Sequence, residues 1–179
     1  MTNTKILSEK TLFTSQYFDI EEITLQRNGK TFVKEFAKRR PIVLVLAINK
    51  NDEVYLVSQY REILKKETLE LVAGHCDGRE PLVAAKSELE EEAGVTAKKW
   101  RELTILDQSA NILQKIHVFL ATGLTEKQAH PDDDEDLRAI KIPFKEAVSK
   151  ALSGEITIAA NIAVILLFDK LRQEGKLYM

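Results

Sequence analysis

Apolar residues run together or alternate with polar ones along several short segments, as they do in β-strands. Residues Ile42–Ile48 form a nearly continuous run of β-branched and leucine side chains, which indicates a strand covered on both faces. Further strands are expected at Glu53–Gln59, Thr68–Val72, Trp100–Leu106, Ile116–Ala121 and Leu137–Ile142.

A second pattern, with apolar residues at helical spacing, marks the segment Leu82–Ala93. Leu82, Ala85 and Leu89 share one helix face there, acids dominate another, and Gly94 ends the segment as a C-terminal glycine does. Two more helices are expected, at Phe144–Leu152 and Ala159–Arg172. Strands with helices between and after them predict an α/β layered domain with a mixed sheet.

The N-terminal region has the signature of a β-hairpin. Phe18–Leu25 and Thr31–Phe36 alternate on either side of Asn28-Gly29, a strong hairpin turn. A lone hairpin buries too little surface to be stable, so it must pack on the main domain or on another subunit. We therefore divide the chain into an N-terminal β-hairpin region, residues 1–40, which is a candidate dimerisation element, and a main domain, residues 41–179.

Composition and charge narrow the class of protein. The 179 residues are 44% hydrophobic and 30% charged, as in an ordinary globular protein, and the formal net charge is -2. That charge gives no field that would concentrate DNA or RNA, so we expect no nucleic-acid partner. The single cysteine, Cys76, is expected to be an inert small residue and implies no oxidising compartment. The longest apolar run, Ile162–Phe168, is too short to span a membrane, and we expect a cytoplasmic protein.

The candidate chemistry lies on the acidic face of the Leu82–Ala93 helix. Residues three and four positions apart share a helix face, so Glu88, Glu91 and Glu92 project their carboxylates into one region. Oxygen ligands of this kind suit a hard cation such as Mg²⁺ or Mn²⁺. The alternative is a solvated acidic face with no function, in an unrelated fold.

The residues from Ser87 to Val95 resemble the second half of the signature of the Nudix hydrolases. That signature reads Arg-Glu-aliphatic-x-Glu-Glu-x-Gly-aliphatic, and the chain has Ser87-Glu88-Leu89-Glu90-Glu91-Glu92-Ala93-Gly94-Val95, which matches at every specified position except the arginine. The resemblance implies a Nudix-type α/β/α sandwich and a metal-dependent hydrolase of nucleoside-diphosphate-linked compounds.

Within that family the chain is similar to the ADP-ribose pyrophosphatase branch. Ser58-Gln59-Tyr60-Arg61, Glu67–Gly74 and Gly154-Glu155-Ile156 match segments of that branch. The resemblance implies that Arg61 and Glu70 hold the nucleotide, that the carbonyl of Ala73 joins the glutamates around the metal, and that the protein is a homodimer. Without the resemblance, Arg61 is a surface ion-pair partner and Glu70 a strand-edge charge.

The implied reaction is cleavage of a pyrophosphate bond, which turns ADP-ribose into AMP and ribose 5-phosphate. A bound metal polarises a phosphoryl oxygen, orients the attacking water and neutralises charge on the leaving phosphate. Glu88, Glu91 and Glu92 are the expected catalytic residues, because a positioned carboxylate also accepts the proton of the water.

The chain departs from the family pattern at three positions. Counting back from Glu88, the signature glutamate falls at Arg79, as if one residue were missing from the loop His75–Gly78, and Ser87 replaces the arginine that steadies the metal site in relatives. Gln114 stands near a position that is acidic in relatives, and glutamine cannot act as a base. The acidic loop Asp132–Asp136 is an alternative source of a base. The rival hypothesis is therefore a Nudix domain that binds a nucleotide without hydrolysing it efficiently.

Overall fold

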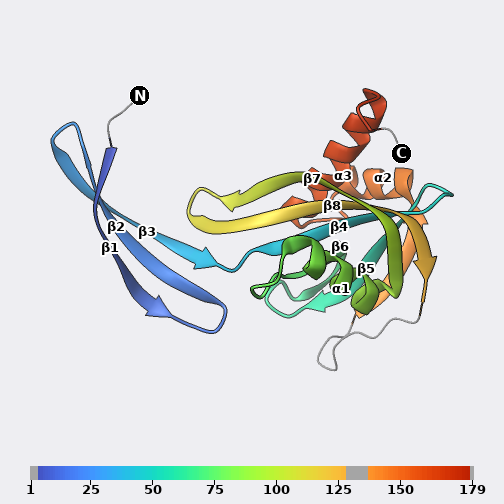
Figure 1. Cartoon of the computed structure of the whole chain (residues 1–179), viewed down its shortest axis with the longest axis horizontal. Coiled ribbons are helices and arrows are strands. Elements are labelled where there is room, and N and C mark those ends of the chain that lie inside the picture. The colour runs from blue at the N-terminus through green and yellow to red at the C-terminus, as the bar shows by residue number, and fades with distance from the viewer. Residues whose placement is uncertain (1–3, 128–136, 178–179) are drawn as a thin grey trace. The chain divides into compact units, whose positions relative to one another are not determined.

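The computed structural model describes residues 4–127 and 137–177 (Figure 1). His130 and the acidic loop Asp132–Asp136 lie outside these ranges. The chain divides into two compact units: a larger unit, residues 42–105 with 117–179, and a smaller unit, residues 1–41 with 106–116. The smaller unit thus includes residues 106–116, which the sequence predicts as part of the main domain, and the division at residue 40 stays a prediction.

The larger unit is built on a sheet with the strand order β8-β4-β6-β5-β9, in which β7 also pairs with β8. The pairs β4–β6, β5–β6 and β5–β9 are antiparallel. Every strand that the sequence predicts in this unit is present, and most extend further at one or both ends. Their bounds are β4 Ile42–Ile48, β5 Glu53–Arg61, β6 Lys66–His75, β7 Val95–Ser109, β8 Ile112–Glu126 and β9 Leu137–Pro143.

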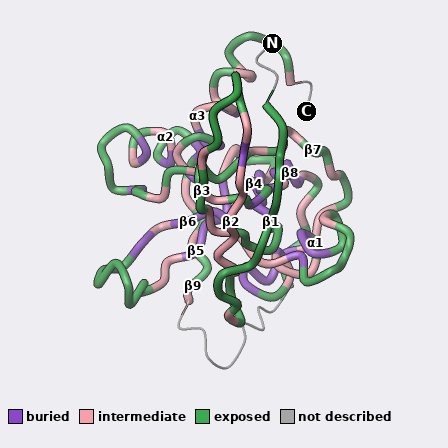
Figure 2. The backbone as a smooth tube through the Cα atoms, turned by 90° about the vertical axis from the view of Figure 1, so that its left-hand side faces the viewer, coloured by how far each residue is buried: buried purple, intermediate pink, exposed green. Residues whose placement is uncertain are grey.

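Helices pack on both faces of this sheet, and Figure 2 shows helices on either side of its strands. One face of β4, with Val43 and Val45, packs in a core cluster with Ala85 and Leu89 of α1 (Pro81–Ala93). Side chains alternate along a strand, so the equally buried Leu44, Leu46 and Ile48 point to the other face, where α3 contributes Val164, Ile165 and Phe168. The prediction of an α/β fold is confirmed.

All three predicted helices are present, and the ends of α1 follow the local signals. Pro81 occupies its first turn, and Gly94 ends it in the left-handed conformation with φ 62°. The other two helices are α2 (Phe144–Ser153) and α3 (Ala159–Gln173). None of the helices in the described ranges has both the length and the apolar character that a membrane span requires.

Asn161 of α3 serves as a polar tie between this helix and the middle of β6. β4 pairs with β6 only as far as Val72, and the next N–H along β6, that of Leu71, donates to Asn161 Oδ1 at 2.7 Å. A buried backbone N–H without a partner is costly, so Asn161 completes the hydrogen bonding of the strand. No local pattern in the sequence marks this residue.

The smaller unit contains the predicted hairpin and one strand more. β2 (Phe18–Arg27) and β3 (Lys30–Arg39) are antiparallel and joined at Asn28-Gly29, with φ values of 52° and 75° that fit a hairpin turn. β1 (Thr4–Thr14), which we did not predict, pairs with β2. The start of β8 joins β3 in parallel, which makes the sheet mixed, as expected.

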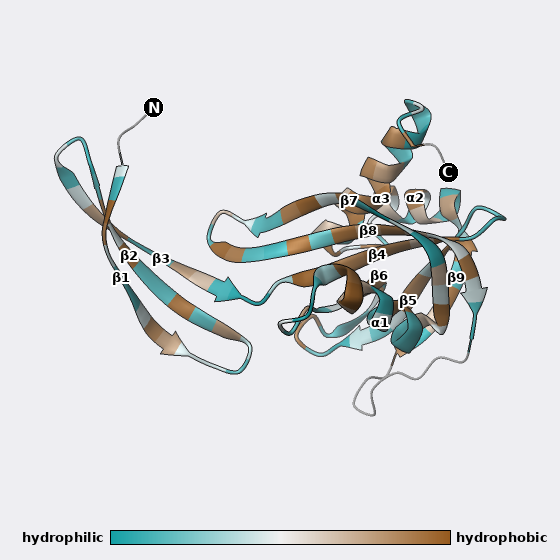
Figure 3. Ribbon diagram, in the orientation of Figure 1, coloured by the Kyte–Doolittle hydropathy of each residue, from teal (hydrophilic) through white to brown (hydrophobic). Residues whose placement is uncertain are grey.

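β1 exposes all of its residues, including large apolar ones. Ile6, Leu7, Leu12 and Phe13 are each exposed. Figure 3 shows apolar bands alternating with polar ones along the strands of this unit. Large exposed apolar surfaces mark interaction sites, so β1 is a candidate for one.

Candidate active site

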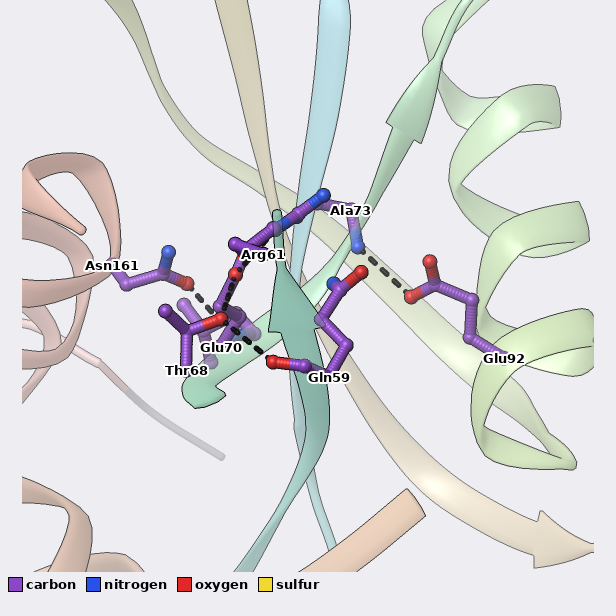
Figure 4. A network of polar contacts seen from close by, with 8 residues as sticks. Gln59, Arg61, Thr68, Glu70, Ala73, Glu92 and Asn161 are labelled. Carbon is purple, nitrogen blue, oxygen red and sulfur yellow. Dashed lines mark hydrogen bonds and ion pairs between the residues drawn. The ribbon is translucent and has the colours of Figure 1, made fainter. Parts of the chain in front are cut away.

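Glu92 anchors the acidic face of α1 to the backbone of β6. Its carboxylate is buried, and its Oε2 accepts a hydrogen bond from the N–H of Ala73 at 3.2 Å. Figure 4 shows the side chain reaching from the helix toward this strand. A buried carboxylate without such a donor would be strongly destabilising, so this contact helps to fix the helix at Ala73.

Glu88 lies against the next residue of the same strand. A Cβ placed at Gly74 would collide with the carboxyl group of Glu88, so only glycine admits this carboxylate so close to the strand. The carboxylates of Glu88 and Glu92 therefore converge on two consecutive residues, Ala73 and Gly74. The side chain of Glu88 is 15% exposed and remains within reach of solvent.

Glu91 makes a different contact from Glu88 and Glu92. Its carboxylate is exposed and accepts a hydrogen bond from Ser87 Oγ at 2.8 Å. Among the described residues, no three histidine, cysteine, aspartate or glutamate side chains gather as a metal-binding group. The roles predicted for Glu91 as a ligand and as a catalytic residue stay predictions.

The loop between β6 and α1 places a cation beside Glu88. The guanidinium of Arg79 donates to the carbonyl oxygens of Cys76 at 3.2 Å and His75 at 3.1 Å. Its Nη2 also lies 3.4 Å from Glu88 Oε1. The sequence pattern marked position 79 as altered, but it did not show that the substituted arginine contacts a predicted metal ligand.

Arg61 and Glu70, on neighbouring strands, form a bidentate ion pair. Arg61 Nε and Nη2 donate to the two oxygens of Glu70 at 2.8 and 2.7 Å, and Thr68 Oγ1 adds a bond of 2.6 Å (Figure 4). Glu70 is 4% exposed. Burial raises the pKa of Glu70, but the hydrogen bonds from Arg61 and Thr68 and the charge of Arg61 outweigh it, so the pKa is lowered.

The donor set at Ala73–Gly74 fits a divalent cation. Glu88 and Glu92 offer carboxylate oxygens, which are the ligands that Mg²⁺ and Mn²⁺ prefer. The absence of a Cβ at Gly74 leaves room for the Glu88 carboxylate against the strand, next to the residue whose N–H Glu92 binds. These observations favour Glu88 and Glu92 as the core of a metal site, with the carbonyl of Ala73 as a predicted third ligand.

The structure also gives the surroundings of Cys76 and Gln114. Cys76 is buried, and burial raises the pKa of its thiol, against the lowering effect of Arg79, which agrees with an unreactive side chain. Gln114 is buried in the smaller unit, where its Nε2 donates to the carbonyl oxygen of Arg40 at 2.7 Å. Gln114 therefore holds the start of β8 to the chain segment before β4.

We predict that Arg61→Ala destabilises the protein by about 1–2 kcal/mol at pH 7, because it leaves the buried Glu70 carboxylate without its counter-charge. The folded-state pKa of Glu70 is below its unfolded value, so the stabilisation from the pair is full above roughly pH 4.3 and is lost as the pH falls through the folded value. The difference between wild type and variant should therefore shrink below pH 4. Urea unfolding of wild type and variant, measured at pH 7 and below pH 4, tests this.

Arg138→Ala is the matched control. It removes an arginine from the exposed pair with Glu67, whose side chains are 70% and 66% exposed, and it should cost less than about 0.5 kcal/mol. Equal losses in the two variants, or a loss for Arg61→Ala that does not change with pH, would contradict the role given to the buried pair.

Comparison with known proteins shows what this chain is similar to. The family model described as NUDIX domain matches residues 38–161. A Bacillus subtilis (strain 168) protein named ADP-ribose pyrophosphatase is 34% identical over 85% of this chain and 88% of its own. A protein of the same name from Mycobacterium tuberculosis (strain ATCC 25618 / H37Rv) is 32% identical over 89% of this chain and 80% of its own.

A more distant relative and a solved structure extend the comparison. A Salmonella arizonae (strain ATCC BAA-731 / CDC346-86 / RSK2980) protein named GDP-mannose pyrophosphatase is 29% identical over 91% of this chain and 93% of its own. A crystal structure described as that of an ADP compounds hydrolase has a TM-score of 0.81, with 24% identity over 97% of both chains, and shows the same fold. The family model covers more than half of the chain, and the matched residues include α1 with its glutamates. This protein therefore belongs to the Nudix family.

Proposed function

We propose that this protein is a metal-dependent hydrolase that cleaves the pyrophosphate bond of a nucleoside-diphosphate-linked substrate, such as ADP-ribose or a nucleotide sugar. The observation that carries the proposal is the convergence of the Glu88 and Glu92 carboxylates on Ala73–Gly74. The names of the relatives, ADP-ribose pyrophosphatase and GDP-mannose pyrophosphatase, support this substrate class. The products are a nucleoside monophosphate and a sugar phosphate.

The metal that we propose is Mg²⁺, with Mn²⁺ as a substitute; Nudix hydrolases generally use divalent ions. Glu88, Glu91, Glu92 and the carbonyl of Ala73 would hold it. When bound, the metal supplies Lewis-acid polarisation of a phosphoryl oxygen and charge neutralisation. We propose that Glu91 also accepts a proton from water; in support, its carboxylate is exposed and accepts a hydrogen bond from Ser87.

Arg61 and Glu70 are proposed to orient the nucleotide. The side chain of Arg61 is 44% exposed, so its planar guanidinium can meet a base or phosphate, and the buried carboxylate of Glu70 fixes its direction. A guanidinium held in place in this way binds at a smaller entropy cost than a free one.

A second candidate function is nucleotide binding with little hydrolysis. The contact between Arg79 and Glu88 favours it, because a fixed cation beside a metal ligand disfavours metal binding. Ser87 adds to this, since its hydroxyl contacts Glu91 instead of supplying a positive charge to the site. Turnover measurements separate the two candidates.

We also propose that the protein is a homodimer in which β1 meets the second copy. β1 is an edge strand of its unit, and its exposed Ile6, Leu7, Leu12 and Phe13 would be covered by a partner. The cytoplasmic location stays a prediction of the sequence.

The test of the proposed reaction is incubation with Mg²⁺ and a panel of ADP-ribose, GDP-mannose and dinucleotide polyphosphates, with products separated by chromatography. We expect wild type to form AMP and ribose 5-phosphate from ADP-ribose or the corresponding pair from another substrate. Glu92→Gln should reduce turnover by about 100-fold, because it keeps an acceptor for the Ala73 N–H but removes the charge that holds the metal. No turnover on any compound, with nucleotide binding retained, would support the second candidate instead.

Gly74→Ala separates the metal site from the fold. The new Cβ displaces the Glu88 carboxylate, which is the end of a flexible side chain, so we expect a small change in melting temperature and a fall in turnover of about 100-fold. Gly175→Ala is the control: Gly175 has a φ of 65° and open space around it, so alanine should lower stability by about 1 kcal/mol without affecting turnover. Wild-type turnover in Gly74→Ala would refute the placement of Glu88.

The dimer proposal predicts a change in mass. The double variant Leu7→Lys/Phe13→Lys places two charges on the exposed apolar part of β1 and should shift the sedimentation mass from two copies to one. Glu9→Lys, on the same strand, should leave the dimer intact. A monomeric wild type, or a dimer that survives the double substitution, would exclude β1 as the interface.

A further inference from the structure

The positively charged guanidinium of Arg79 lies beside the candidate metal site. Its Nη2 lies 3.4 Å from Glu88 Oε1, and Glu88 is one of the two glutamates whose carboxylates converge on Ala73–Gly74. The guanidinium group of arginine carries a full positive charge. A divalent ion bound to Glu88 therefore shares that carboxylate with a positive group of the protein.

The position of this guanidinium is fixed by the loop. Nε donates to the carbonyl oxygen of Cys76 and Nη2 to that of His75, so the group is tied to its own backbone independently of Glu88. The backbone N–H of Arg79 also donates to the carbonyl of Cys76, at 2.8 Å. These bonds resist withdrawal of the side chain when a metal enters, although 37% of the side chain is exposed.

Ser87, the residue before Glu88 on the helix, does not contact the Glu88 carboxylate in the hydrogen bond that it makes. Ser87 precedes Glu88, and its hydroxyl donates to Glu91, so it contacts a different carboxylate. The contact of Arg79 with Glu88 thus places the cation on the metal ligand itself.

We propose that Arg79 is a positioning residue that shares the Glu88 carboxylate with the divalent metal and lowers the affinity of the site for that metal. This inference rests on the part of the proposed function that identifies the metal site. It does not depend on whether the protein hydrolyses a nucleotide. A unit charge held within about 6 Å of a divalent ion in a water-like dielectric, partly screened by salt, weakens binding by about fivefold. The consequence is a site that fills only at higher Mg²⁺ or Mn²⁺ concentrations than two carboxylates alone would need.

The test is a titration of the full chain with Mn²⁺ in the absence of nucleotide, followed by the electron paramagnetic resonance signal of free Mn²⁺. Arg79→Gln, which removes the charge and keeps donor groups, should bind Mn²⁺ about fivefold more tightly than wild type. Arg79→Lys, which keeps the charge, should bind within about twofold of wild type. Lys86→Gln removes the same charge from an exposed position on α1 and should also stay within about twofold.

Unchanged or weaker Mn²⁺ binding by Arg79→Gln would overturn the proposal, and so would a gain of equal size in Lys86→Gln. Circular dichroism confirms that each variant is folded, and Arg79→Met, which keeps the aliphatic stem, repeats the measurement if the glutamine variant fails to fold. Because Mn²⁺ binding is read without substrate, this result is independent of whether the protein turns over any nucleotide. If wild type and Glu92→Gln both fail to bind Mn²⁺, the metal site itself is wrong and the proposal falls with it.

Discussion

The packing of two carboxylates of α1 against the backbone of β6 is the interaction on which the candidate site depends. Two like charges on one helix face repel each other, and Glu92 is buried as well. The N–H of Ala73 satisfies Glu92, and the missing side chain of Gly74 makes room for Glu88. The apolar contacts of Ala85 and Leu89 with β4 hold the helix at the distance that these contacts require.

β6 is the strand that links this site to the rest of the larger unit. It carries Ala73 and Gly74 under the carboxylates of α1, and Glu70 in the ion pair with Arg61 of β5. At Leu71 it is tied to Asn161 of α3. One strand therefore positions the metal-binding and nucleotide-binding candidates within a few residues, and this proximity suits a substrate in which a nucleoside is joined directly to a pyrophosphate.

The loop before α1 modifies the same site through charge. The chain has Arg79 at the position where the family signature has a glutamate, and the guanidinium of Arg79 contacts the carboxylate of Glu88. A helix that retains its glutamates can thus differ in metal affinity from relatives with the same helix. The second function that we consider, binding with little hydrolysis, is the extreme case of this effect.

The sequence by itself determined the elements of the larger unit and the family, because buried strands and an amphipathic helix have strong periodic patterns and the run Glu88–Gly94 is specific. It did not predict β1, since a strand whose residues are all exposed has no buried face to produce such a pattern. Only the tertiary structure decided that Arg79 contacts Glu88, that Asn161 completes β6 and that Gln114 binds the carbonyl of Arg40. These contacts join residues through loop paths and strand registers, which local propensity does not encode.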